Sequence, residues 1–269
     1  MHNTFIEAPL VVLEDFLSWI LFEDNDLLVL DKPAWLVCHP SKNGPWSSLV
    51  GVTKEYLGVD SIHLVSRLDR ETSGVVMLAK HRKAASFWQK GVEQRKVRRQ
   101  YLAILKGEMT EESEISTFIG NDPDSKVFVK QRVTQESRKS QKAITCFEPL
   151  KFGNGHTFCR VTTKTGRKHQ IRVHANYIGH EIIGDKLYGS SDSYYLSFCQ
   201  GGWSDKWIKE LGMKRQALHG NKLAHQENGQ NFSAPLPSDM KEYLKKSVGW
   251  QPKEVEEVIK GAGQELSCR

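Results

Sequence analysis

The sequence lacks the features that place a chain in a membrane or outside the cell. None of its apolar stretches, in 269 residues, is long enough to cross a bilayer. The most apolar early segment, residues 9–22, is interrupted by Glu14 and Asp15. No basic leader precedes it, which argues against a secretory signal. We therefore expect a cytoplasmic protein that does not bind membranes.

Cysteine is scarce, and the glycine-rich fingerprint of nucleotide-binding loops is missing. The cysteines lie far apart, without the close spacing of zinc or redox sites. His169 and His174 are five residues apart, which does not place them on one face of a helix, and no acidic ligand adjoins them. The sequence predicts neither a metal site nor a cofactor. The five cysteines are Cys38, Cys146, Cys159, Cys199 and Cys268.

Internal repeats, low-complexity tracts and long linkers are also missing. The strand patterns outnumber the helical ones and often follow one another directly, which favours an α+β fold with a large, mostly antiparallel mixed sheet flanked by helices. On helix 83–95 we expect Ala84, Phe87, Trp88 and Val92 to form the buried stripe. Strands are expected at 20–23, 27–30, 101–105 and 157–163, with 125–133 paired to 143–150, and helices at 49–57, 83–95, 169–177 and beyond 238.

Positive charge is concentrated in the middle third of the chain. Residues 1–79 carry a net charge of −6, residues 80–174 carry +12, and residues 175–269 are neutral. A basic run is often only a solvated helix face. Here, however, one basic run leads to Tyr101 and another surrounds Arg172. This distribution favours a nucleic acid as partner, because Lys and Arg bind phosphates.

The most informative segment is Arg67-Leu-Asp-Arg-Glu-Thr-Ser-Gly74. It places Asp69 between Arg67 and Arg70, whose positive charges favour the ionised carboxylate. An ionised carboxylate suits a nucleophile or a base. Thr72, Ser73 and Gly74 are turn residues, and the apolar run that follows predicts a buried strand. We therefore expect Asp69 on a loop that enters this strand.

This octet resembles the catalytic loop of the RluA-type pseudouridine synthases, which isomerise uridine in RNA. Four further segments match in the same order, and several separated matches are far more specific than one short motif. They are Asp31-Lys-Pro-Ala-Trp-Leu-Val-Cys-His-Pro40, Arg99-Gln-Tyr-Leu-Ala-Ile-Leu-Lys-Gly107, Thr165-Gly-Arg-Lys-His-Gln-Ile-Arg-Val-His174 with Gly184-Asp-Lys-Leu-Tyr-Gly189, and the late markers Ala217-Leu-His219 and Ala234-Pro-Leu-Pro237.

The resemblance implies a pseudouridine synthase fold with a central basic cleft and an RNA substrate, ribosomal or transfer RNA. The matched core covers about residues 20–240. Too few residues precede it for a separate N-terminal RNA-binding module, so we expect one catalytic domain over 1–269, acting as a monomer without a cofactor. Lys32-Pro33 and residues 184–189 are expected to be structural turns.

The resemblance also assigns roles to individual residues. Asp69 is the essential carboxylate, Arg172 pairs with it, and Tyr101 packs on the base, which must be flipped out of its stack to be reached. Whether Asp69 attacks covalently or removes a proton from the ribose is left open. Residues expected to bind substrate are Arg67, Leu218, Arg167, His169 and Arg99.

Two departures from the family pattern affect substrate choice more than the reaction. Ser66 stands where the family usually has His, and Trp35 where it usually has Gly. The alternative is an RNA-binding protein that keeps the fold without the reaction, although phosphate binding alone would not need Asp69. A glycosidase with Asp69 and Glu71 as its carboxylate pair is a further reading, which the basic surroundings disfavour.

Overall fold

The computed structural model describes residues 10–39, 43–189 and 191–263, so Pro40 of the first motif and Cys268 lie outside the described residues. The chain forms two compact units. The first consists of residues 1–100, 196–203 and 219–235. The second consists of residues 101–195, 204–218 and 236–269.

The first unit contains the Asp69 loop and most of the N-terminal strands. Its helix boundaries follow sequence signals: α2 begins after Ser48, whose hydroxyl accepts the Gly51 N–H, and ends at Gly58 in a left-handed conformation. The elements are α1 (Leu13–Ser18), β1 (Ile20–Glu23), β2 (Leu27–Lys32), η1 (Pro45–Ser47), α2 (Leu49–Leu57), β3 (His63–Leu64), β4 (Ser73–Ala79), α3 (Arg82–Glu93), β10 (Leu218–His225, whose first residue belongs to the second unit) and β11 (Asn231–Ser233).

The second unit contains the longest strands and the Arg172 helix. Strand β5 (Val97–Lys106) begins in the first unit and continues into the second, and α5 (Ser193–Gly201) also has residues in both. The remaining elements are β6 (Ser113–Asn121), β7 (Gln131–Thr134), β8 (Gln141–Gly153), β9 (His156–Thr163), α4 (Gln170–Tyr177), η2 (Asp205–Trp207), α6 (Ile208–Leu211), α7 (Ser238–Lys246) and α8 (Pro252–Ala262).

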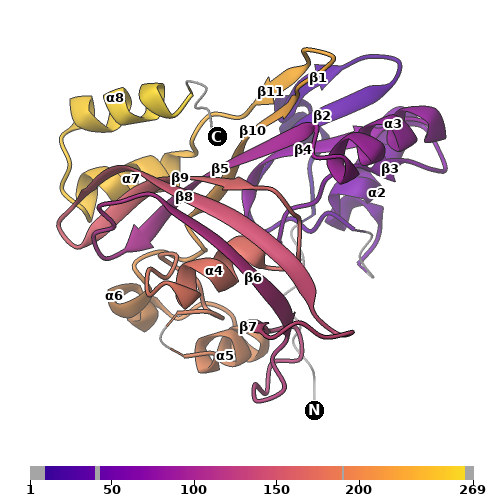
Figure 1. Ribbon diagram of the computed structural model, residues 1–269. Helices are drawn as coiled ribbons and strands as arrows, with labels where there is room; N and C mark the ends of the chain where they lie inside the picture. The colour runs from indigo at the N-terminus through magenta and orange to yellow at the C-terminus, as the bar shows by residue number, and fades with distance from the viewer. Residues whose placement is uncertain (1–9, 40–42, 190, 264–269) are drawn as a thin grey trace. The chain divides into compact units, whose positions relative to one another are not determined.

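The strands of the described residues form one 11-stranded sheet in the order β1-β2-β4-β10-β5-β9-β8-β6-β7, with β3 on β4 and β11 on β10 (Figure 1). Antiparallel pairs include β1–β2, β2–β4, β6–β8 and β8–β9, whereas β4 and β10 run parallel. This mixed, mostly antiparallel sheet with helices confirms the predicted α+β class. No described helix combines the length and apolar character that spanning a bilayer requires.

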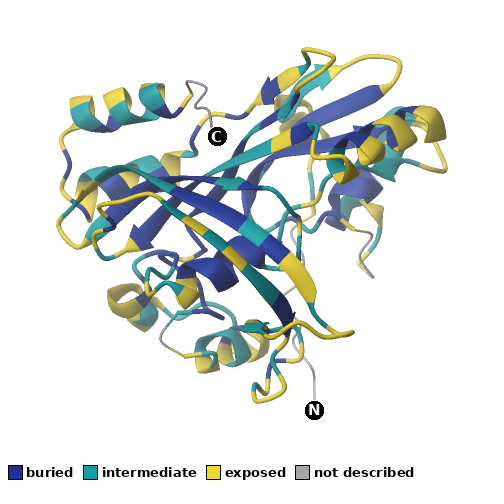
Figure 2. Ribbon diagram, viewed as in Figure 1, coloured by how far each residue is buried: buried dark blue, intermediate teal, exposed yellow. Residues whose placement is uncertain are grey.

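Strand β4 is buried along its whole length because apolar residues cover both faces of it (Figure 2). Successive side chains of a strand point to opposite faces. Val75 and Met77 therefore join a cluster with Trp88 of α3, while Val76 and Leu78 join a cluster of α1 and α2 residues. Burial on both faces explains why the run after the octet is continuously apolar.

Close backbone approach fixes the start of β4. Gly74 pairs with Lys32 of β2 on one side and with Gly220 of β10 on the other. Its φ is 116°, and a Cβ added there would lie 2.2 Å from the Gly220 carbonyl oxygen. Only glycine fits this position, because both the backbone conformation and the space exclude a side chain.

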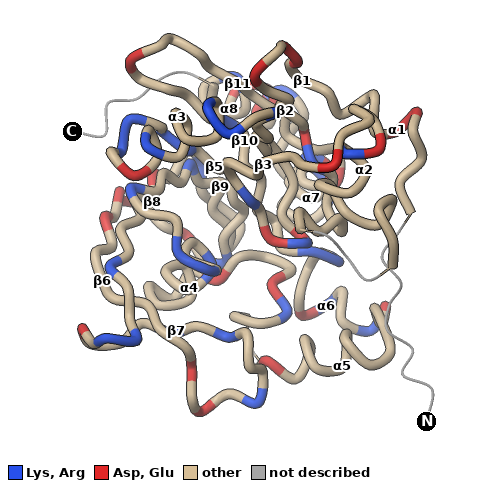
Figure 3. Tube along the Cα trace, turned by 90° about the vertical axis from the view of Figure 1, so that its right-hand side faces the viewer, with Lys and Arg blue, Asp and Glu red and all other residues tan. Residues whose placement is uncertain are grey.

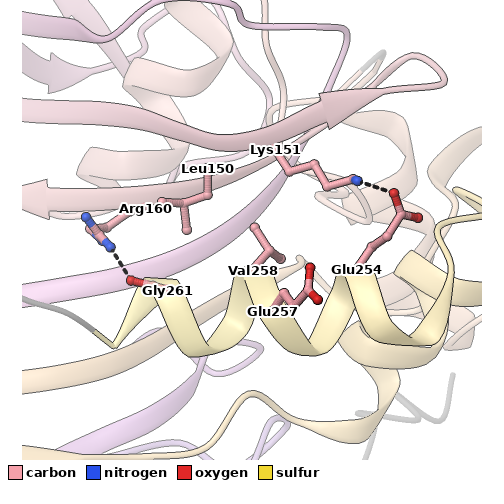
Figure 4. Close-up of a pocket in the computed structure, with 7 residues that line it drawn as sticks. All are labelled: Leu150, Lys151, Arg160, Glu254, Glu257, Val258 and Gly261. Atoms are coloured by element: carbon pink, nitrogen blue, oxygen red, sulfur yellow. Dashed lines mark hydrogen bonds and ion pairs between the residues drawn. The ribbon is translucent and has the colours of Figure 1, made fainter.

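In the second unit, α4 packs on β6, β7 and β8, and in the view of Figure 1 α8 lies above β8 and α4 lies below it. Beside α8 is an open hollow of about 490 Å³. Lys151 pairs with Glu254 across it at 2.6 Å, and Arg160 donates to the Gly261 carbonyl at the end of α8 (Figure 4). The candidate site residues, all of them described, do not line this hollow.

Two expectations about the elements are wrong. Residues 125–133 are mostly loop, and their short strand β7 pairs with β6, which also pairs with β8. Residues 125–133 therefore do not pair with 143–150 as predicted. Instead β7 and β8 each pair with β6, which lies between them. Phe87 is 49% exposed and stacks on His225 instead of joining the core. Helix α3 otherwise follows its predicted stripe, with Ala84 and Trp88 buried.

Substituting Gly74 tests the β4–β10 approach. We expect Gly74→Ala to lower the free energy of unfolding by about 3 kcal/mol or more, because the methyl group must displace the backbone of β10. Gly201→Ala is the control, since a Cβ there meets nothing within 4 Å and its φ is ordinary. Urea unfolding measures both. Equal stability of Gly74→Ala and the parent protein would contradict the packing.

A buried histidine predicts acid sensitivity. Thr117 Oγ1 lies 2.9 Å from His174 Nε2, and Thr145 Oγ1 lies 2.8 Å from Nδ1. Burial lowers the pKa of His174 from 6.5 to about 4. Above pH 6.5 the neutral ring is present in both folded and unfolded chains. As the pH falls toward 4, the unfolded chain binds a proton that the folded chain does not, so stability falls.

We expect about 3 kcal/mol of this loss to come from His174. His174→Gln should therefore be less stable than the parent protein at pH 7, and this difference should shrink as the pH falls to 4. Urea unfolding at several pH values measures it. Parallel stability curves for the two proteins would show that His174 does not cause the loss.

Candidate active site

Asp69 lies on the loop between β3 and β4, as the sequence predicts, and it is partly buried. Its carbonyl oxygen accepts the Thr72 N–H at 3.1 Å, which closes a turn. Ser66, at the start of this loop, accepts the Met77 N–H through its hydroxyl at 3.1 Å. The serine that departs from the family pattern thus fastens the loop to β4.

A buried lysine ties the first motif to this loop. Lys32 is fully buried at the end of β2, and its ammonium group donates to the carbonyl oxygens of Pro33 and Leu36 at 2.7 and 2.9 Å. It also donates to Arg70, next to Asp69, at 3.3 Å. A buried ammonium group needs such acceptors. The Lys-Pro segment therefore supports the Asp69 loop in addition to forming a turn.

The late motifs hold the end of the loop that enters β4. His219 is buried with Nε2 3.3 Å from the Ala234 carbonyl oxygen and Nδ1 3.0 Å from the Ser73 hydroxyl. A nitrogen that faces a carbonyl must carry the proton, so Nδ1 accepts from Ser73. Three motifs that are far apart in sequence therefore meet at the start of β4, four residues after Asp69.

Trp35 adopts a backbone conformation that explains why a glycine suits this position. Its φ is 74°, which is strained for a residue with a bulky side chain. The ring packs at 5.7 Å from that of Phe198, and the Arg70 guanidinium lies 6.0 Å from its centroid. These contacts with aromatic and cationic groups offset the strain and place a large ring beside the residue that follows Asp69.

The basic residues of the first unit include Arg67 on this loop and a group at the start of β5. Arg67 is exposed, with Nη1 3.4 Å from His39 Nε2. Arg99 lies in β5, and its buried Nε has no hydrogen-bond partner in the described part of the chain. Lys96 pairs with Glu227 at 2.9 Å. The blue segments at α3 in Figure 3 mark further Lys and Arg residues just before β5.

In the second unit, Tyr101 and Leu218 belong to the same apolar cluster. Leu218 is buried in it, and Tyr101 is partly buried and packs against it. The residue expected to pack on the base and the one expected to supply an apolar wall are thus parts of one core cluster. A tyrosine held against aliphatic groups keeps its ring in one orientation.

Arg172 is buried on α4 and has a carboxylate partner within its own unit. Its Nε and Nη2 donate to the two oxygens of Asp185 at 2.6 and 2.9 Å, a bidentate pair. Asp185 also accepts the backbone N–H groups of Leu187 and Tyr188. The Arg172 guanidinium lies 4.9 Å from the Tyr188 ring centroid, so the group is held from two sides.

Asp185 is ionised in this arrangement. Burial alone raises the pKa of its carboxyl group, but the charge and hydrogen bonds of Arg172 and two backbone N–H donors lower that pKa below its usual value. The sequence reasoning treated residues 184–189 as structural turns and missed this role. No local pattern indicated it, because Asp185 lies 13 positions from Arg172 and the two residues meet only through the fold.

The two other predicted residues of this unit frame the start of α4. His169 precedes the helix in a left-handed conformation with φ 55°, and its Nδ1 lies 2.8 Å from the Tyr188 hydroxyl. Arg167 donates from Nε to the Lys142 carbonyl oxygen at 2.9 Å. Arg167, His169 and Arg172 thus belong to one segment, whereas Asp69 belongs to the first unit. The predicted pairing of Arg172 with Asp69 stays a prediction.

Comparison with known proteins identifies the family to which these motifs belong. The sequence profile of the RNA pseudouridylate synthase family matches residues 26–177. The uncharacterized RNA pseudouridine synthase YjbO of Bacillus subtilis is 37% identical over 236 residues, which are 84% of this chain and 75% of that protein. Ribosomal large subunit pseudouridine synthase D of Yersinia pestis is 32% identical over 234 residues, covering 84% and 69%.

A solved structure supports the same assignment. Human RNA Pseudouridylate Synthase Domain Containing 4 has a TM-score of 0.66 and 25% identity, over 86% of this chain and 93% of that one. The profile match includes Asp69, Tyr101 and Arg172, and the likeness to the solved structure extends over most of the fold. The chain therefore belongs to the RNA pseudouridylate synthase family and is of the RluA type.

Proposed function

We propose that this protein converts specific uridines of large-subunit ribosomal RNA to pseudouridine. The family supports the reaction and the RNA class. The choice of ribosomal RNA rests on relatives in Yersinia pestis and Xanthomonas campestris, both named ribosomal large subunit pseudouridine synthase D. The basic middle third of the chain fits a polyanionic substrate.

The reaction breaks the bond from ribose C1′ to base N1 and joins C1′ to C5 of the same base. It is redox-neutral and needs no group donor. In our proposal the Asp69 carboxylate acts at the ribose, either as nucleophile or as base. Tyr101 packs against the flipped base, and Arg172 keeps the Asp69 carboxylate charged. Leu218 forms an apolar wall beside Tyr101, and Arg67 holds the flipped nucleotide.

The observation that carries this proposal is the way the Asp69 loop is held. Lys32 fixes the carbonyl of Arg70, His219 fixes Ser73, and Ser66 fixes the loop to β4. A loop fastened at three points keeps a catalytic side chain in one position, which is what positioning catalysis requires. A protein that only bound phosphates would need no carboxylate so supported.

We also propose that the protein works as a single catalytic domain and as a monomer in the cytoplasm. The named roles all come from one chain, and the proposed substrate is a cytoplasmic RNA. We place Arg67, Arg99, Arg167 and His169 in contact with this RNA, because they lie in or beside the three segments that carry Asp69, Tyr101 and Arg172.

The proposal is tested with large-subunit ribosomal RNA transcribed with tritium at uridine C5, since joining C1′ to C5 releases that tritium. We expect Asp69→Asn to lower tritium release by about 10²–10⁴-fold or more, because an amide is neither a base nor a nucleophile. Glu71→Gln, in the same loop, should retain activity. Release by Asp69→Asn at the parent rate would refute the role of Asp69, and loss in Glu71→Gln alone would favour a different carboxylate.

Asp185→Asn tests the support of Arg172. The amide keeps the acceptor for the backbone N–H groups but removes the charge, so we expect a loss of about 3 kcal/mol of unfolding free energy. It should also lower kcat at temperatures where circular dichroism shows a folded protein. Asp239→Asn is the matched control: Asp239 also holds an arginine, Arg215, at 2.6 Å, but its side chain is 46% exposed.

We expect Asp239→Asn to lose less stability and to keep its kcat, because water reaches the half-exposed Asp239 side chain and screens its charge, although Arg215 itself is buried. Unchanged kcat in folded Asp185→Asn would show that Asp185 serves stability alone.

A further inference from the structure

An exposed aromatic ring stands beside the Arg172 segment. Phe128, on the loop between β6 and β7, is 85% exposed, the highest value among the large hydrophobic side chains of the described residues. The ammonium group of Lys168 lies 5.7 Å from its ring centroid. Lys168 immediately precedes His169, so this ring and cation lie at the start of α4.

The loop that carries Phe128 is held rigidly. Val127 donates its N–H to the Ser125 hydroxyl, which donates to Asp192 at 2.7 Å. Lys130 donates to the Val127 carbonyl oxygen and pairs with Asp192 at 3.4 Å. These bonds leave the ring of Phe128 in solvent although the backbone around it is fixed. Folding gains little from such a ring, so its position suits binding.

Charges near the ring divide into two groups. Lys130 and Arg132 are neutralised by ion pairs with Asp192, Asp122 and Asp124. Lys126 and Lys168 are exposed and have no ion-pair partner among the described residues. Phe128 therefore has one cation near its ring, Lys168, and a second, Lys126, two residues away in sequence, and the charge of both is available to a ligand. An exposed aromatic face with adjoining cations matches an unpaired base and its phosphate.

The ring is also connected to Arg172. The Tyr188 hydroxyl accepts the Gln131 N–H at 2.9 Å and bonds His169 Nδ1 at 2.8 Å. The Tyr188 ring in turn lies 4.9 Å from the Arg172 guanidinium. Tyr188 thus connects the end of the Phe128 loop and the start of α4 to the buried Arg172–Asp185 pair. Phe128 and Arg172 both belong to the second unit, so these contacts lie within one compact unit.

We propose that Phe128 and Lys168 form a second nucleotide-binding site, separate from the groups that carry out the reaction. An unpaired base of the RNA stacks on the exposed face of Phe128, and Lys168 contacts an adjoining phosphate. The site selects RNA with a single-stranded nucleotide near the target uridine. This inference rests on the proposed function for its ligand, because the substrate is taken to be RNA.

The test is fluorescence anisotropy with two RNA probes at fixed salt: a labelled single-stranded oligouridylate and a blunt RNA duplex of the same strand length. Phe128→Ala should weaken oligouridylate binding by about tenfold, the effect of losing one stacked base. Phe128→Tyr keeps an aromatic ring and should bind oligouridylate as the parent protein does. Neither substitution should change the affinity for the duplex. The control is Phe152→Ala, which removes another exposed aromatic ring, in β8, and should leave both affinities unchanged.

Lys168→Ala should reduce the slope of log affinity against log salt by about 0.7 for the loss of one single-strand phosphate contact. Three results would each overturn the site. The first is that Phe128→Ala binds oligouridylate as tightly as the parent protein does. The others are that Phe152→Ala loses as much affinity as Phe128→Ala, or that the parent protein does not bind oligouridylate. Failure of tritium release would refute the proposed reaction instead, and the anisotropy result would still decide whether Phe128 stacks a base.

Discussion

The buried ion pair between Arg172 and Asp185 is the constraint on which the second unit depends. Removing a guanidinium group from water is costly unless a carboxylate and further hydrogen bonds compensate for the lost solvent. Asp185 provides both oxygens to Arg172 and still accepts two backbone N–H groups, so its position is fixed by four donors. The direction of the Arg172 side chain follows from this arrangement.

In the first unit, several distant motifs serve one short loop. Gly74 allows β4 to approach both β2 and β10, which brings Lys32 to Arg70, beside Asp69, and His219 to Ser73, where the loop enters β4. Their bonds replace the local secondary structure that a loop lacks. The separated motifs of the family are therefore physically related here: each one supplies a partner that another requires.

The sequence predicted elements well where a local signal decides them. Helix α2 has the predicted bounds of 49–57, because a serine cap and a terminal glycine mark its ends. The Asp69 loop and the buried strand after it were also predicted correctly. The β6–β7 region was not, since pairing partners are chosen by tertiary contacts that no local pattern records. Phe87 was misassigned because an aromatic at helical spacing can remain half exposed and stack on one side against a histidine, here the buried His225.

The candidate site was predictable mainly through the motifs. Asp69, Tyr101 and Arg172 were identified by resemblance, whereas the partners that hold them came from the structure. Asp185, Lys32 and His219 appeared to be turn or marker residues because their function depends on contacts across 13 to 146 positions of sequence. Contacts over such distances are set by topology and leave no periodic pattern.

The pseudouridine that we propose this chain makes in ribosomal RNA can be located in cells. The decisive measurement is a map of the pseudouridines of ribosomal RNA in cells with and without the protein. We expect at least one pseudouridine that disappears without the protein, returns with the parent chain and does not return with Asp69→Asn. A map that is the same in all of these cells would contradict this proposal.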